Sequence, residues 1–145
     1  MRSCFPDVNV WIALSYRGHL HHNVARQWLN EAGAAEIFFC RLTQLGFLRL
    51  LTNARVMERD VKSQREAWRV YDRWLEDDRV SFRPEPPELE GAFRRLTQAA
   101  QPAGNVWPDA YLVAVAKAAG AAVVTLDAGF RVIAGPDAVV LSPGA

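Results

Sequence analysis

Three aspartates stand at positions where their carboxylates could act together. Asp7 ends a short apolar stretch, Asp127 follows the apolar run "AAVVTL", and Asp109 comes directly after Pro108 at the start of a helical pattern. Carboxylates that gather in one place repel and raise one another's pKa unless a cation lies among them. Oxygen ligands of this kind suit Mg²⁺ or Mn²⁺, with water completing the coordination. The three aspartates therefore predict a site for a hard divalent cation.

Two of these aspartates also have a simpler interpretation when each is considered alone. Asp109 falls in the first turn of an expected helix, where the helix dipole favours a carboxylate. Asp127 precedes "AGF" and fits a turn or the residue that caps a helix. The metal interpretation depends on all three lying together, which the arrangement of strands and helices decides.

Short apolar runs alternate with helical patterns along the chain, which predicts an α/β fold with a parallel, doubly wound sheet. Strands are expected over 2–6, 36–40, 80–82, 121–126 and 138–141. Helices are expected over 8–15, 23–32, 41–53, 60–76, 89–100 and 108–120, with loops over 17–22 and 101–105. Four to five short strands flanked by helices then form a single domain over residues 1–145. Ligands of such sheets bind beyond the carboxyl ends of the strands, which is where the aspartates fall.

Length and composition exclude several classes of protein. A chain of 145 residues, half of them hydrophobic, can bury one core and needs no disulfides. No apolar run approaches the ~18 residues of a membrane span, and the N-terminus lacks the apolar segment of a signal peptide. We therefore expect a cytoplasmic protein without a membrane partner, with Cys4 and Cys40 as buried, reduced thiols. The formal net charge of +1 neither favours nor excludes a nucleic-acid partner.

Four motifs taken together are similar to those of a known family. They are "PDVNVWIAL", "TQLGFLRLLT", "GNVWPDAYLVAVAKAAG" and "VVTLDAGF", and they run from residue 6 to residue 130. Their order and spacing resemble the PIN-domain nucleases, in particular the VapC-type toxins of type II toxin–antitoxin pairs. The resemblance implies a PIN-like fold, a Mg²⁺-dependent endoribonuclease acting on RNA, a cognate antitoxin that blocks it, and a homodimer.

The resemblance also implies roles for individual residues. Asp7 and Asp109 match the family's main Mg²⁺ ligands, and Asp127 matches a further acid that binds metal directly or through water. Mn²⁺ suits the same oxygen ligands. Asn9 in "D-x-N" and Thr125 in "T-x-D" are expected to orient the acids and waters rather than to bind metal.

One position departs from the family pattern. The helix after the second strand usually supplies a glutamate, and Gln44 stands at that place in a segment that contains no acid. An amide oxygen can hold a metal-bound water but brings no charge. We therefore keep Gln44 among the candidate site residues and expect weaker metal binding. Asn105, four residues before Asp109, fits either an orienting role or a loop turn.

A nuclease needs cations for the phosphates of its substrate. Arg49 and Arg55 are expected near the acids and are the preferred candidates. A second basic set shares one face of the expected helix 60–76, but acids interleave around that helix, so an ordinary ion-paired surface is the preferred interpretation. This second set consists of Lys62, Arg65, Arg69 and Arg73.

Large apolar residues on two expected helices favour a protein partner. The helices over 41–53 and 60–76 carry Phe47, Trp68 and Trp74, which is more apolar surface than we expect one small domain to bury. Because large exposed apolar patches mark interfaces, we expect a dimer that also binds a short antitoxin segment.

Other functions fit parts of the sequence. A catalytically weak PIN-like module that acts mainly by binding antitoxin or RNA is the main alternative, and Gln44 favours it. A receiver-type phosphoacceptor needs a paired acid near the first strand and a lysine after the last strand but one. The chain has the single acid Asp7 there and no lysine after Lys117. A D-x-D phosphatase fails because Asn9 replaces the second acid. The loop histidines match no zinc motif by their spacing and are expected to be solvated: His19, His21 and His22.

Overall fold

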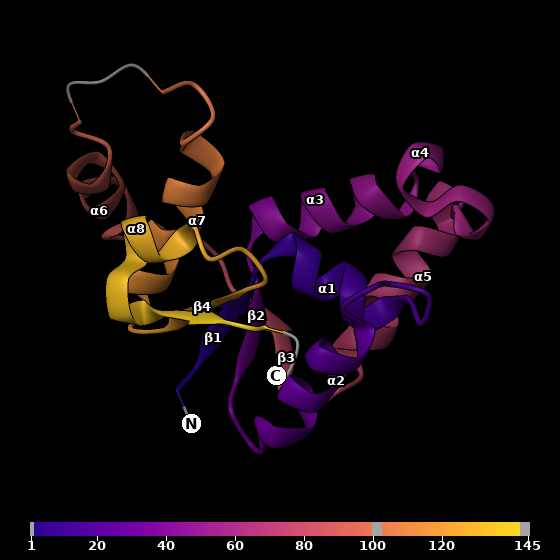
Figure 1. Ribbon diagram of the computed structural model, residues 1–145. Helices are drawn as coiled ribbons and strands as arrows, with labels where there is room; N and C mark the ends of the chain where they lie inside the picture. The colour runs from indigo at the N-terminus through magenta and orange to yellow at the C-terminus, as the bar shows by residue number, and fades with distance from the viewer. Residues whose placement is uncertain (1, 100–102, 143–145) are drawn as a thin grey trace.

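A parallel sheet of five short strands forms the centre of the molecule (Figure 1). The structure is a computed structural model, and it describes residues 2–99 and 103–142. The strands are β1 (Cys4–Pro6), β2 (Ile37–Phe39), β3 (Val80–Phe82), β4 (Ala122–Thr125) and β5 (Ala138–Val140). Their spatial order is β3-β2-β1-β4-β5, and every pairing is parallel. The order therefore reverses at β1, and sheets of this kind bind ligands at such a reversal.

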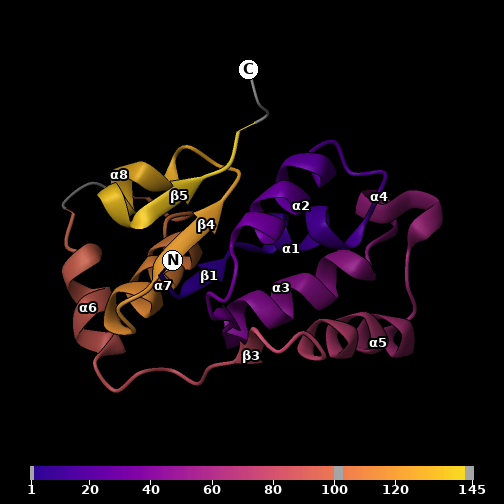
Figure 2. The same cartoon turned by 90° about the horizontal axis from the view of Figure 1, so that it is seen from below.

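Helices cover both faces of this sheet (Figures 1 and 2). One layer holds α1 (Val8–Ser15), α2 (His22–Glu31), α3 (Arg41–Leu51), α4 (Ala54–Met57), the 3-10 turn η1 (Glu58–Asp60) and α5 (Gln64–Leu75). The other layer holds α6 (Leu89–Leu96), α7 (Trp107–Ala118), α8 (Phe130–Ala134) and the 3-10 turn η2 (Gly135–Asp137). The predicted α/β class and doubly wound parallel sheet are thus confirmed. Among the helices described, none has the length and apolar character needed to cross a bilayer.

Alternating side chains of the strands build two separate cores. Ile37, Phe39 and Val124 face the layer of α1, α2, α3 and α5. Phe38 and Val123, their neighbours in sequence, face the layer of α6, α7 and α8. Successive residues of a strand point to opposite faces, so a strand covered on both sides must be apolar throughout. The central strands are therefore continuous apolar runs of three or four residues, without the alternation of apolar and polar residues of a half-exposed strand.

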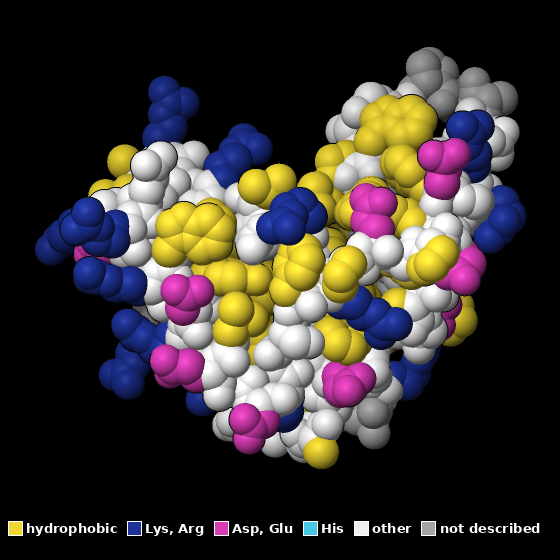
Figure 3. Space-filling view, turned by 180° about the vertical axis from the view of Figure 1, so that it is seen from behind, with side chains coloured by type: hydrophobic (Ala, Val, Ile, Leu, Met, Phe, Trp, Pro, Cys, Tyr) yellow, Lys and Arg dark blue, Asp and Glu magenta, His cyan; other side chains and the backbone are white. Residues whose placement is uncertain are grey.

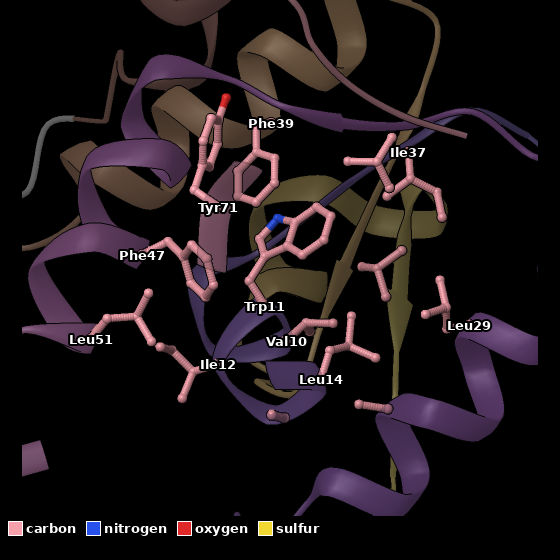
Figure 4. Close-up of a cluster of buried hydrophobic side chains, with 14 of the residues drawn as sticks. Val10, Trp11, Ile12, Leu14, Leu29, Ile37, Phe39, Phe47, Leu51 and Tyr71 are labelled. Atoms are coloured by element: carbon pink, nitrogen blue, oxygen red, sulfur yellow. The ribbon is translucent and has the colours of Figure 1, made fainter. Parts of the chain in front are cut away.

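The first core is centred on a fully buried aromatic stack (Figure 4). The Trp11 ring lies 3.9 Å from the Phe39 ring, centroid to centroid, at an interplanar angle of 11°. Phe47 from α3 and Tyr71 from α5 approach Phe39 at 5.8 Å and 4.8 Å. The stack joins α1, β2, α3 and α5, and it fixes the helix that follows Asp7 against the sheet.

Two expected helix boundaries are wrong because capping residues were overlooked. The helix predicted over 60–76 begins only at Gln64, because Ser63 and Glu66 form a reciprocal capping box at its start. Such a Ser-x-x-Glu pair is a sequence signal for a helix N-terminus. The helix predicted over 41–53 ends at Leu51, and Asn53 instead caps the short helix α4.

The C-terminal half also departs in detail from the expectation. Helix α6 ends at Leu96, so the predicted extent to 99 is too long, and residue 100 lies outside the described residues. Within the loop predicted over 101–105, residues 101 and 102 also lie outside them. Helix α8 and the turn η2 were not predicted. Both thiols are buried as expected, and burial raises the pKa of Cys4 to about 12.

Candidate active site

Asp7 lies at the carboxyl end of the central strand and caps the helix that follows. Its backbone N–H donates to the Val124 carbonyl at 2.8 Å, which continues the pairing of β1 with β4. Its Oδ1 accepts the Val8 N–H at 2.7 Å, so Asp7 is the N-cap of α1. A carboxylate at this position satisfies one of the open N–H groups of the helix. One oxygen of Asp7 is thereby committed to the fold, and the side chain is held at the sheet edge.

Thr125 connects the aspartates that follow β1 and β4. Its side chain is fully buried, and its Oγ1 donates to Asp7 Oδ2 at 3.2 Å. The same Oγ1 accepts the backbone N–H of Asp127 at 3.0 Å. Asp127 Oδ1 in turn accepts the Gly129 N–H at 2.8 Å, which closes the turn after β4. The structure therefore brings Thr125 to Asp7 and fixes the position of Asp127 through the backbone.

The pKa shifts report that the three aspartates lie close together. Burial raises the pKa of Asp7, and the charges of Asp109 and Asp127 raise it further, while the bonds from Val8 and Thr125 oppose the rise. Burial and the charge of Asp127 raise the pKa of Asp109, which lies in the first turn of α7. None of the ion pairs among the described residues involves these acids. Within the described chain, the negative charge that converges at the ends of β1 and β4 is thus not paired with a cation.

The donor set fits a hydrated Mg²⁺ rather than an enclosed metal ion. In residues 2–99 and 103–142, no three Asp, Glu, His or Cys side chains form a group that could hold a metal by themselves. Mg²⁺ needs fewer protein ligands, because it keeps several waters and is usually held by one or two carboxylates. The crowded carboxylates of Asp7 and Asp109, beside the exposed Asp127, offer oxygen ligands of that kind.

Gln44 is directed to a basic residue. Its side chain is buried in α3, and its Oε1 accepts a hydrogen bond from the Arg41 guanidinium. The amide also lies beside the Tyr71 hydroxyl, where its hydrogen bond opposes the rise in the pKa of Tyr71 that burial causes. The structure shows no bond between Gln44 and the three aspartates in the part of the chain it describes. The Gln44 amide therefore has its partners, Arg41 and Tyr71, on α3 and α5.

The two asparagines proposed as orienting residues are exposed. Asn9 lies in the first turn of α1, and Asn105 lies in the turn before α7. Neither side chain forms a hydrogen bond with the aspartates among the residues described. Their roles stay predictions, whereas Thr125 has the contacts expected of it.

Two basic residues that the sequence analysis did not single out stand closer to the strand ends than Arg49 and Arg55 do. Arg49 lies in the last turn of α3, eight residues and roughly 12 Å along the helix from its start at the sheet edge. Arg55 lies beyond it, in α4. Arg83 directly follows β3, and Arg41 stands two residues after the last residue of β2. Sequence reasoning overlooked both, although each stands one or two residues after an apolar strand, as the aspartates do.

The predicted basic helix face is partly wrong. Lys62 precedes α5, and its cation lines a groove between the helices α1, α2 and α5 instead. The groove has a volume of about 620 Å³ and an apolar floor. Its basic residues form no ion pair within the described chain, contrary to the expected ion-paired surface. They are Arg26, Lys62, Arg69 and Arg73, and the apolar residues are Leu14, Val70 and Trp74.

The three loop histidines are partly buried, so the expectation of a solvated loop is wrong in part. The Nδ1 of His19 accepts the His21 N–H at 3.0 Å, and the Nδ1 of His22 lies 2.7 Å from the Ala13 carbonyl. Burial and the neighbouring histidines lower the pKa of His19. These contacts close the loop between α1 and α2 and give the histidines a structural role.

Known proteins are similar to this chain in sequence. The sequence pattern of the PIN domain matches residues 4–136. Ribonuclease VapC41 of Mycobacterium tuberculosis is 43% identical over 129 residues, which are 86% of this chain and 88% of that protein. Ribonuclease VapC38 of the same organism is 31% identical over 135 residues, which are 88% and 87% of the two chains.

Two solved structures are similar in fold at low sequence identity. One is Mycobacterium tuberculosis VapC20, described as a sarcin-ricin loop cleaving toxin, with a TM-score of 0.65, 19% identity, and 90% and 94% of the two chains covered. The other is VapBC2 from Rickettsia felis bound to a DNA fragment from their promoter, with a TM-score of 0.67, 16% identity and 97% of each chain covered. Both support the fold described above.

Proposed function

Because this chain belongs to the PIN-domain family and, within it, to the VapC-type proteins, we propose that it is the ribonuclease toxin of a type II toxin–antitoxin pair. Relatives named ribonucleases support the activity. The observation that carries the proposal is the convergence of Asp7, Asp109 and Asp127 at one sheet edge, without a cation paired to them in the described chain. The reaction is the Mg²⁺-dependent hydrolysis of RNA phosphodiester bonds in the cytoplasm, with Mn²⁺ as a substitute metal.

Each residue of the site has a distinct task in this proposal. Asp7 and Asp109 hold the metal, and Asp127 adds charge directly or through water. Thr125 keeps Asp7 Oδ2 turned toward the site by its hydrogen bond. A bound Mg²⁺ supplies charge for the phosphate oxygens and lowers the pKa of a water. The buried hydroxyl and the N-cap bond hold the acids in place before any ligand arrives, which favours fast chemistry.

The proposal is tested by cleavage of cellular RNA with purified protein and with Asp7→Asn. Asparagine is as good an N-cap as aspartate, so the variant keeps its fold but loses a charged ligand. We expect cleavage to require Mg²⁺ or Mn²⁺ and to fall at least ~100-fold in the variant, because metal catalysis supplies several kcal/mol. The exposed Asp72→Asn on α5 is the matched control. Full activity of Asp7→Asn, or cleavage that persists in EDTA, would contradict the assignment.

A catalytically weak module that acts by binding antitoxin or RNA is the second candidate. The contact of Gln44 with Arg41 favours it, because no fourth acid then adds to the metal site. RNA binding without cleavage at any Mg²⁺ or Mn²⁺ concentration, by protein whose melting curve is normal, would establish this candidate in place of the first.

The cognate antitoxin occupies the groove between α1, α2 and α5 in this proposal. Basic residues that form no ion pair within the described chain line the groove together with apolar residues, which suits an acidic, amphipathic segment. Both acids that line the groove are already engaged, Glu66 with the Ser63 N–H and Asp77 with Arg79. The corresponding test measures antitoxin binding by the wild type and by the double variant Arg69→Glu, Arg73→Glu. We expect the double variant to lose binding.

A homodimer is part of the same proposal. Trp68 and Leu45 are 48% and 57% exposed on α5 and α3. Viewed from behind, hydrophobic side chains gather over these helices and continue toward α6 and α7 (Figure 3). In contrast, Phe47 is fully buried and Trp74 is partly buried, so the expected patch is smaller than predicted. Sedimentation at tens of micromolar, roughly where weak dimers form, with Trp68→Glu as the variant, tests the dimer.

A further inference from the structure

Two basic residues stand on the sheet edge beside the proposed acidic site. Arg83 continues β3, and its backbone N–H donates to the Phe39 carbonyl at 2.8 Å. Arg41 begins α3 directly after β2. In the strand order β3-β2-β1-β4, the edge therefore runs from Arg83 through Arg41 to Asp7 and then to Asp127. Neighbouring strands lie ~4.8 Å apart, so the strands that precede Arg41 and Arg83 lie within about two strand spacings of β1, the strand that precedes Asp7.

Aromatic rings hold both guanidinium groups without neutralising them. The Cζ of Arg41 lies 4.5 Å from the centre of the Phe82 ring, and that of Arg83 lies 5.1 Å from the Phe38 ring. A guanidinium stacked on a ring face keeps its N–H groups available for an anion. Neither arginine forms an ion pair among the described residues, and the nearby Glu85 accepts the Tyr111 hydroxyl at 2.8 Å.

The two arginines lie on opposite sides of the sheet edge. Phe82 packs against the α1, α2, α3 and α5 layer, whereas Phe38 belongs to the core beneath α6, α7 and α8. Their stacked guanidinium groups therefore flank the edge from both layers. Figure 3 shows a notch in the molecular surface between these two layers.

The hydrogen bond to Gln44 orients the Arg41 guanidinium without neutralising its charge. The buried amide oxygen accepts a guanidinium N–H and brings no negative charge. A glutamate at this position would form a partly buried ion pair with Arg41 and cancel its charge. The neutral residue at position 44 is thus matched to a cation that must stay available.

We propose that Arg41 and Arg83 form a binding site for the backbone phosphate next to the scissile bond, with Gln44 as the positioning residue of Arg41. This inference rests on the proposed function, since it assigns the path of the RNA from the acids toward β2 and β3. Phosphate is recognised by guanidinium groups through paired N–H bonds. Contacts of this kind fix the register of a strand without reading its bases.

The test measures binding rather than cleavage. A fluorescent single-stranded oligoribonucleotide is titrated with the full chain in EDTA at several salt concentrations. Arg41→Gln and Arg83→Gln should each weaken binding about tenfold, as expected for a charged hydrogen bond. Each should also reduce the salt slope by about 0.7, the value for one phosphate contact on a single strand. The control Arg65→Gln, which removes an equal charge from exposed α5, should change affinity less than twofold.

Two further variants separate charge from packing. Arg41→Lys should keep the salt slope, and Gln44→Glu should lower affinity several-fold because it neutralises Arg41. Binding of both glutamine variants within twofold of the wild type, or no binding by the wild type, overturns the proposal. Mg²⁺-dependent cleavage by the wild type is measured in parallel. Its absence would reject the proposed function even if both arginines bind RNA.

Discussion

The two halves of the sheet edge differ in charge and in the way their side chains are held. At the ends of β1 and β4, Asp7 and Asp127 are fixed by hydrogen bonds to the backbone and to Thr125. At the ends of β2 and β3, Arg41 and Arg83 are fixed by aromatic rings. Hydrogen bonds orient a carboxylate in one direction, whereas a ring face supports a guanidinium and leaves its edge open.

This difference indicates which half is complete without a ligand. The charges of Asp109 and Asp127 raise the pKa of Asp7, and the charge of Asp127 raises the pKa of Asp109, so like charges oppose one another in the acidic half until a cation binds. The basic half has no such conflict, because its two guanidinium groups lie on separate rings. Metal should therefore change the acidic half strongly and the basic half little.

The largest expected effect comes from replacing Asp109, which is proposed to hold the metal together with Asp7. Asp109→Asn should lower RNA cleavage at least ~100-fold, because it removes one of two proposed metal ligands. RNA binding in EDTA should remain, since the basic half is unchanged. Cleavage rates and anisotropy titrations measure the two halves separately. A loss of RNA binding equal to that in Arg41→Gln would show that the halves do not act independently.

Thr125→Val should have the next largest effect on the acidic half. The substitution leaves Asp7 Oδ2 without its donor and the Asp127 N–H without its acceptor. We expect a loss of about 1–3 kcal/mol in the free energy of unfolding and roughly tenfold slower cleavage. Denaturant melts and initial rates measure both quantities. Thr125→Ser, which keeps the hydroxyl, should retain most of the activity, and an inactive serine variant would argue against the hydrogen bond as the cause.

Gly46→Ala tests the close contact between α3, which begins at Arg41, and α1, which begins directly after Asp7. A Cβ at Gly46 of α3 would lie 2.6 Å from the Val8 side chain, directly after Asp7. We expect a destabilisation of about 1–3 kcal/mol from overpacking. Gly91→Ala on α6 is the control, since its Cβ would meet only the flexible end of Arg95 at 3.3 Å. The control should gain about 0.5–1 kcal/mol in helix stability. Equal melting temperatures of the two variants would contradict this packing argument.

The smallest expected effect is a gain in stability. The pKa of Asp7 is raised in the folded protein above its ordinary value of 3.8, so folding favours the protonated acid. That contribution is present below pH 3.8 and is lost as the pH rises through the higher folded pKa. Asp7→Asn should therefore melt at a higher temperature than the wild type in EDTA at pH 7. The difference should close below pH 4, and a constant difference across pH would exclude charge as the cause.

The sequence was sufficient for the fold and for the acidic half of the edge. The aspartates that follow apolar strands can be recognised in the sequence. Because parallel strands end on the same side of a sheet, these aspartates are expected to lie together. The basic half could not be predicted from the sequence, because the aromatic rings that hold its arginines are brought to them by strand pairing. Phe82 and Phe38 become neighbours of the arginines only when β3 pairs with β2. The burial of Phe47 likewise follows from the close approach of two helices at Gly46, which helical periodicity alone does not show.

The bond between Thr125 and Asp7 has a consequence for the order of events during synthesis. The two residues are 118 positions apart in the chain, and β4 must insert beside β1 before they meet. A ribosome extends the chain from the N-terminus, so Asp7 is made early and waits for its partners. The growing polypeptide has no assembled acidic site until residues 109–127 have emerged. In the proposed function, cleavage therefore cannot begin before the segment that carries Thr125 and Asp127 has been made and has paired with β1.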